Sequence, residues 1–286
     1  MKSRAALSRR FGEEFEMARV SGLCASGVHA AVAAGVLFSA ARAVASPYAS
    51  NWTSYGAGTG ASASYLDPTS AVGSPTRFTG VQFGFPSVVS PFSPPFDPGD
   101  FVSIGRGGHL TLTFDHDVYN RATNAFGVDF IVFGNWFYTD GGGFASGKFA
   151  TPNGVIEVSK DGSDWRTVLG VSPTDGYATL GYSDLASPYD TSPGNVPTNF
   201  TKAVDPSFNP IGKTFAEIVA GYNGSGGGTG IDFASTGLDF IRYVRISNPD
   251  GNIGNINIDG IAEVPTPVTA SLFVIASLIA PRRRRA

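Results

Sequence analysis

The last 23 residues, 264–286, constrain the organisation of this chain most, because they are not composed like part of a folded domain. An apolar run over 268–280 is followed by Pro281 and then by four arginines, Arg282, Arg283, Arg284 and Arg285. As a helix this run would measure about 20 Å, against about 30 Å for the hydrocarbon core of a membrane. We expect a short membrane helix with its arginines on the cytoplasmic side and everything before residue 264 outside. The alternative, a buried helix of a soluble domain with a basic tail, is disfavoured because four adjacent terminal arginines would not cap a core helix.

The segment before the apolar run completes a three-part pattern. Pro265, Thr266 and Pro267 precede the run and the arginine cluster. A Pro-x-Pro motif, a short membrane helix and an arginine cluster in this order resemble the PEP-CTERM sorting signal of Gram-negative bacteria. The resemblance covers only the tail, 265–286, and Thr266 stands where the family usually has Glu. It implies transient attachment to the inner membrane, processing by an exosortase-type membrane transpeptidase, and delivery to the cell surface or the extracellular space.

The N-terminus has the features of an export signal. A mostly small and apolar stretch over 23–41 is followed by an A-x-A site that ends at Ala45. We predict a signal peptide over 1–45, with cleavage between Ala45 and Ser46. The first residues carry three glutamates, which is unusual for a signal peptide, and a start at Met17 would give a more compact signal. An uncleaved membrane anchor is the alternative.

The composition of the predicted exported domain, 46–264, limits its fold and its partners. It retains 10 of the 20 Lys and Arg residues and 20 of the 23 Asp and Glu residues, a net charge of −10. This charge argues against a nucleic-acid partner and favours cation binding or simple solubility. The single cysteine, Cys24, lies in the predicted signal, so we expect neither disulfides nor thiolate metal sites. With 37 Gly and 19 Pro the chain should turn often, which favours an all-β domain over a helical or doubly wound enzyme.

Short runs of β-forming residues support the all-β prediction. The run over 109–114 alternates apolar residues with threonines, as in a half-buried strand, and the denser apolar run over 128–133 suits a strand inside a sandwich. Asp161-Gly162 lies between two β-rich runs and predicts a hairpin, because glycine accepts the positive φ of such a turn. The expected strands, with one or two more in the entry segment 48–84, are 101–104, 109–114, 128–133, 155–159, 165–169, 240–246 and 253–264.

Other segments predict irregular structure. The proline-rich stretch 85–99 cannot be a central strand. Thr214 and Glu217 form a capping-box pattern that predicts a short helix ending near Ala220. We expect loops over 85–99, 135–147 and 170–212, and a flexible glycine loop over 223–230.

Three stretches together resemble galactose-binding-domain-like β-sandwiches, which are jelly rolls. They are Val158-Ser159-x-Asp161-Gly162-x-x-Trp165, Tyr243-Val244-Arg245-Ile246 and Ile258-Asp259-Gly260-Ile261. The likeness spans about 100–264 and extends to cell-surface proteins of unassigned activity that carry the same sorting tail. It implies a single jelly-roll β-sandwich over 46–264. A fold of this kind does not by itself specify a function.

No catalytic pattern stands out. His109 and His116 are the only histidines after the predicted signal, they lack a metal-ligand helical spacing, and no serine lies in a nucleophile-elbow context. We therefore predict a protein that is not an enzyme. A pair of carboxylates for glycoside hydrolysis stays open, because 20 acidic residues are available in the exported domain.

Two groups of residues are candidates for binding. Calcium prefers oxygen ligands, and jelly rolls of the type resembled here often hold a structural ion near the chain ends, which points to Asp97, Asp100 and Glu263. Solvated loop acids are the alternative. The aromatic side chains of Trp136, Phe137 and Tyr138 could stack on sugar rings, or they could belong to the core beneath a loop.

We expect an exported, non-catalytic protein of the cell surface or extracellular matrix, sorted by its tail. A carbohydrate-binding module that acts on exopolysaccharide is the alternative, and a glycoside hydrolase is a further one.

Overall fold

A computed structural model describes residues 45–81 and 84–265, which belong to one compact unit. Of the predicted signal 1–45 and the predicted sorting tail 265–286, all residues except Ala45 and Pro265 lie outside the described residues. Within the described ranges no helix is long and apolar enough to cross a membrane.

The described chain is predominantly β, as predicted, and its larger sheet has five antiparallel strands in the order β1-β3-β10-β7-β8. Leu110 and Leu112 of β3 are buried, and so are Ile156 of β7 and Val244 of β10, as the period-2 pattern predicts. The strands are β1 (Asn51–Gly56), β3 (His109–Tyr119), β10 (Phe240–Ser247), β7 (Val155–Ser159) and β8 (Arg166–Val168).

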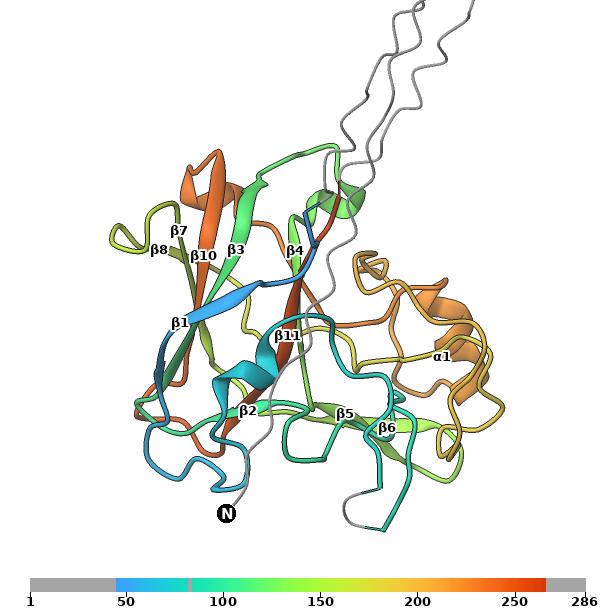
Figure 1. Cartoon of the computed structure of the whole chain (residues 1–286). Helices are drawn as coiled ribbons and strands as arrows, with labels where there is room; N and C mark the ends of the chain where they lie inside the picture. The colour runs from blue at the N-terminus through green and yellow to red at the C-terminus, as the bar shows by residue number, and fades with distance from the viewer. Residues whose placement is uncertain (1–44, 82–83, 266–286) are drawn as a thin grey trace, which may run out of the picture. The chain divides into compact units, whose positions relative to one another are not determined.

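A second antiparallel sheet has four strands in the order β2-β11-β4-β9. They are β2 (Val102–Ile104), β11 (Ile256–Glu263), β4 (Phe130–Gly134) and β9 (Thr229–Ile231). Ile104, Val132 and Ile258 from this sheet share one buried cluster with residues of the five-stranded sheet. The two sheets therefore enclose a common core in the manner of a β-sandwich (Figure 1).

Strand β4 is buried on both faces, which explains its dense apolar sequence. Phe130 and Val132 point into the core between the sheets, whereas Ile131 and Phe133 belong to a second cluster with Phe200. Phe200 lies in the long irregular segment over 170–212, which contains no helix or strand, as predicted. Phe200 and Ala203 of this segment pack against the outer face of β4.

The predicted hairpin is confirmed, and one predicted loop is wrong. Gly162 between β7 and β8 has φ +80°, and the carboxylate of Asp161 accepts hydrogen bonds from the backbone of Ser163 and Asp164. The segment 135–147, predicted as a loop, contributes instead to a third sheet, β5 (Phe137–Asp140) with β6 (Ala145–Phe149). Some of its glycines form the tight turn between the strands, where the Asp140 carboxylate accepts hydrogen bonds from two of them. The high glycine content of the segment concealed the strand pattern.

The helix α1 (Phe215–Tyr222) carries the predicted capping box, between Thr214 and Glu217, and extends two residues beyond Ala220. The remaining helical elements are 3-10 turns: η1 (Pro68–Ala71), η2 (Ala125–Gly127) and η3 (Ala234–Thr236). In Figure 1, α1 and the β5–β6 hairpin lie on the side of the four-stranded sheet.

The glycine loop that follows α1 is packed rather than flexible, contrary to the prediction. Gly226, Gly227 and Gly228 are buried. A Cβ atom at Gly226 would lie 2.1 Å from the Phe200 ring, and one at Gly228 would lie 2.4 Å from Ile131. Glycine is needed here because the backbone passes directly against these side chains.

The first and last described segments run side by side. The backbone N–H of Ala49 donates to the carbonyl of Ile261 at 3.1 Å, and that of Glu263 donates to Pro47 at 2.6 Å. Val264 is buried and donates to the Asp129 carbonyl at 2.9 Å. Ala45, Ser46 and Pro265 are exposed just beyond this pairing.

Candidate functional site: an aromatic pocket beside strand β9

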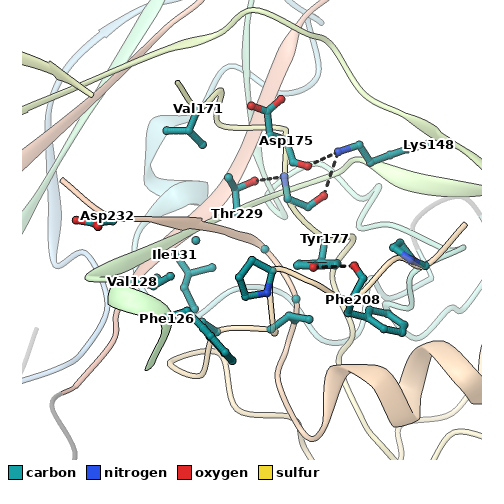
Figure 2. Close-up of a pocket in the computed structure, with 18 of the residues that line it drawn as sticks. Phe126, Val128, Ile131, Lys148, Val171, Asp175, Tyr177, Phe208, Thr229 and Asp232 are labelled. Carbon is teal, nitrogen blue, oxygen red and sulfur yellow. Dashed lines mark hydrogen bonds between the residues drawn. The ribbon is translucent and has the colours of Figure 1, made fainter. Parts of the chain in front are cut away.

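A pocket of about 530 Å³ lies where the outer face of β4 and β9 meets two loop segments, 171–177 and 203–211. Figure 2 shows Phe126, Val128 and Asp232 on one side of it and Lys148, Tyr177 and Phe208 on the other. Its volume falls in the range of small-molecule sites. Its lining is mostly apolar: Phe126, Val128, Ile131, Tyr138, Lys148, Val171, Asp175, Gly176, Tyr177, Ala203, Val204, Pro206, Phe208, Pro210, Ile211, Gly227, Gly228, Thr229, Gly230 and Asp232.

Backbone pairing between β9 and the 171–177 segment shapes the floor. Tyr177 and Gly228 exchange two backbone hydrogen bonds of 3.0 and 2.9 Å. The Thr229 hydroxyl accepts a hydrogen bond from the Gly176 N–H and donates one to the Pro173 carbonyl. The sequence of 170–212 has no hydrophobic periodicity, so it could not predict these contacts.

Tyr177 and Phe208 form an aromatic wall of the pocket, and the Tyr177 hydroxyl fixes it by hydrogen bonds to backbone carbonyls. The hydroxyl of Tyr177 lies 2.7 Å from the Asp205 carbonyl oxygen and 2.9 Å from that of Phe208. The ring of Tyr177 packs edge-on against Tyr222 at 5.6 Å between centroids and lies 6.2 Å from Phe208. Burial, with the nearby charge of Asp205, raises the pKa of Tyr177, so this hydroxyl stays protonated at neutral pH.

Lys148, the one lysine of the described lining, is hydrogen-bonded to the 171–177 segment. Its ammonium lies 2.9, 2.6 and 3.1 Å from the carbonyl oxygens of Thr174, Asp175 and Gly176. An ammonium has three N–H donors, so all three are used. Loss of hydration lowers the pKa of Lys148, while the charge of Asp175 acts in the opposite direction.

Two carboxylates also line the pocket. Asp175 accepts a hydrogen bond from the Ser172 backbone through Oδ2, and Asp232 accepts one from the Ala234 backbone through Oδ1. The other oxygen of each accepts no hydrogen bond from the residues that the structure describes. These two oxygens can accept donors from a ligand. The described lining contains no His, Ser or Cys that could serve as a nucleophile or a histidine base.

Phe126 has an unusual conformation. It lies in η2 with φ 59° and ψ 18°, in the left-handed region that few residues other than glycine adopt, and its side chain is 53% exposed. The turn is anchored by Asp129, whose buried carboxylate accepts hydrogen bonds from the Arg121 backbone and the Asn124 amide. Burial raises the pKa of Asp129 to about 6, against these hydrogen bonds, and the charge of Asp232 adds to the shift.

The structure brings two of the three predicted calcium ligands together. Asp100 accepts hydrogen bonds from the Asp97 N–H at 3.0 Å and from the Thr79 hydroxyl at 2.5 Å. Burial raises the pKa of Asp100. Glu263 instead contacts His116, with 2.8 Å between Oε2 and Nε2. In the described ranges no group of three or more His, Cys, Asp or Glu side chains is arranged to hold a metal ion.

A buried carboxyl that sequence analysis did not single out lies near Asp100. Asp259, at a bulge in β11, is 2% exposed and accepts hydrogen bonds from the backbone and the hydroxyl of Thr76. Burial raises its pKa to about 8, and the charge of Asp100 contributes. Asp259-Gly260 inside an apolar strand was the only sequence signal for this position.

The predicted aromatic candidates are mostly core residues. Trp136 and Tyr138 are 3% and 2% exposed, and the Trp136 indole donates to the Tyr177 carbonyl at 2.8 Å. Tyr138 lines the inner end of the pocket, and burial raises its pKa to about 12. Phe137 stacks on the exposed ring of Phe149 at 5.3 Å, outside the pocket lining.

The other histidine of the described residues, His109, lies 2.7 Å through Nε2 from the Ser54 hydroxyl. No carboxylate of the described residues is hydrogen-bonded to its ring, so a complete Ser-His-Asp arrangement is not formed there.

Comparison with known proteins does not assign this chain to a family. No protein-family model matches the sequence, and no curated protein matches it either.

Proposed function

We propose that this chain is an exported, non-catalytic protein of the cell surface or extracellular matrix. In this proposal 1–45 is a signal peptide, 46–264 is a jelly-roll domain, and 265–286 is a sorting tail of the PEP-CTERM type. The tail holds the protein at the inner membrane until an exosortase-type transpeptidase cuts near Pro265, Thr266 and Pro267.

One observation carries this proposal. Among the described residues, a backbone pairing joins the two ends of the domain: the Glu263 N–H donates to the Pro47 carbonyl at 2.6 Å, and the Ala49 N–H donates to the Ile261 carbonyl at 3.1 Å. Ser46 and Pro265 are exposed just outside it. A cut after Ala45 and a cut at Pro265 or beyond would therefore leave this pairing intact.

Intact mass of the protein recovered from the cell envelope and from outside the inner membrane tests this. We expect an N-terminus at Ser46 and a C-terminus near Pro265 to Pro267. Substituting serine for all four arginines, Arg282 to Arg285, should weaken retention at the inner membrane, because the orientation signal is lost. Recovery of external protein that still carries Arg282 to Arg285, or a Met1 or Met17 N-terminus, would contradict the proposal.

Carbohydrate binding is the second candidate, and the pocket beside β9 favours it. Aromatic rings can pack against the C–H faces of sugar rings, and carboxylate oxygens accept hydrogen bonds from hydroxyl groups. Phe126 and the carboxylates of Asp175 and Asp232 place both kinds of group on one lining.

Binding and hydrolysis are separated by one measurement. Incubating the processed protein with neutral exopolysaccharide should give a bound complex and no new reducing ends. Release of reducing ends that is lost in Asp175→Asn or Asp232→Asn would instead assign glycoside hydrolysis to this carboxylate pair.

A further inference from the structure

We infer that the pocket beside β9 binds an uncharged or amino-bearing sugar ring stacked on Phe126, and rejects acidic polysaccharides. This inference rests on the carbohydrate-binding function proposed above, and it adds the class of ligand and the residue that carries recognition.

Phe126 is the first support. A phenylalanine in the left-handed region is strained, and such strain gathers at ligand sites. Phe126 is 53% exposed, so folding buries only about half of its surface. The neighbouring backbone is nevertheless fixed: Gly127 donates to Asn124 at 3.0 Å and Val128 donates to Ala125 at 3.2 Å. The turn therefore presents a flat apolar surface at the pocket wall.

The charges of the lining are the second support. All three N–H donors of Lys148 are hydrogen-bonded to backbone carbonyls, so none is left for a ligand anion. Asp175 and Asp232 each keep one oxygen without a donor among the described residues. The groups left for a ligand are thus hydrogen-bond acceptors with negative charge.

This pattern selects by charge. Hydroxyl groups satisfy the two carboxylates, and an ammonium group does so with added electrostatic attraction. A uronic acid would place its own carboxylate beside them, and Lys148 would have no N–H donor left to bond it. Like charges of this kind disfavour a partner. The net charge of −10 over 46–264 adds long-range repulsion.

The test uses the processed protein and three probes in calorimetry: neutral glucan oligosaccharides, chitosan oligosaccharides and oligogalacturonate. We expect binding of the first two and none of the third. Phe126→Ala should weaken binding about tenfold or more, since stacking on one aromatic ring contributes on that scale in other ligands. The matched control is Phe149→Ala, a phenylalanine that is 66% exposed and outside the pocket, which should bind as the unchanged protein does.

The carboxylates are tested with Asp175→Asn and Asp232→Asn. Each should reduce the preference for chitosan over neutral oligosaccharides, and thermal melts confirm that each variant is folded. Tight binding of oligogalacturonate, or equal binding by Phe126→Ala, would overturn the inference while leaving carbohydrate binding in place. If none of the three probes binds, the carbohydrate-binding function itself fails.

Discussion

At the scale of single residues, the most informative position is Phe126. It has left-handed backbone angles, a largely exposed ring and a place in the pocket lining. Stability alone gives no reason for phenylalanine there, since glycine would adopt these angles without strain. A residue that costs stability and lines a pocket is more simply explained by binding.

This reasoning predicts opposite effects on stability and binding. The free energy of unfolding of Phe126→Gly should be about 1 kcal/mol larger than that of Phe126→Ala. Alanine keeps the strain of the left-handed backbone angles, and glycine does not. Both variants should lose binding. Urea unfolding of the two variants measures the difference. A Phe126→Gly protein that is clearly less stable than Phe126→Ala would show that the turn is not strained.

At the scale of elements, the β5–β6 hairpin has a structural role that its glycine-rich sequence conceals. Strand β6 carries Lys148, whose ammonium joins the carbonyls of three consecutive residues in the 171–177 segment. This contact holds the loop that supplies Asp175 and Tyr177 to the pocket. The hairpin therefore positions this loop, in addition to contributing Tyr138 and Lys148 to the pocket lining itself.

Lys148→Met should destabilise the protein by about 1 kcal/mol, because three carbonyls lose a charged donor at a site that water still reaches. Ligand affinity should fall with it as the 171–177 segment loosens. Lys213→Met is the control, since the Lys213 ammonium pairs with Glu217 at 3.7 Å on the exposed surface, and its loss should change stability by less than about 0.5 kcal/mol. Equal effects of the two substitutions in chemical denaturation would contradict this role of Lys148.

At the scale of the whole molecule, several buried groups titrate in the same direction. Burial raises the pKa of Asp129 to about 6 and that of Asp259 to about 8, from 3.8. Partial burial lowers the pKa of His116, but its hydrogen bonds to Asp115 and Glu263 outweigh this, so the pKa is raised. A group whose pKa is raised by folding contributes stability below its unfolded pKa and loses it as pH rises through the folded value.

The protein should therefore be more stable at pH 5 than at pH 7, and more stable at pH 7 than at pH 9. The loss from Asp129 should fall between about pH 4 and 6, the loss from Asp259 should run from about pH 4 to 8, and the loss from His116 should begin at about pH 6.5. Urea unfolding at pH 5, 7 and 9 measures the slope, and Asp259→Asn should flatten it most between pH 5 and 7. Stability that rises from pH 5 to pH 9 would contradict the raised pKa values of these three groups.

Much of the fold was predictable because its signals are local. Alternation in β3, the Asp161-Gly162 turn and the capping box at Thr214 each depend on residues close together in the chain, and each is confirmed. The β5–β6 hairpin was missed because its glycines, placed partly in a tight turn, resemble a loop. The packed glycines after α1 were missed because sequence does not distinguish a glycine that is free to move from one that another chain segment must approach.

The candidate pocket was decided by tertiary structure alone. Phe126, Lys148, Asp175, Phe208 and Asp232 come from five separate segments, none with a pattern of its own. Asp259 meets Thr76 across 183 positions of the chain, and Glu263 meets His116 across 147. Local sequence determines backbone angles and which side chains face inward, and so it determined the strands, the turns and the all-β class. Which loops then meet over the outer face of the four-stranded sheet depends on the pairing of distant segments, and only that pairing brings an aromatic ring and two carboxylates into one cavity.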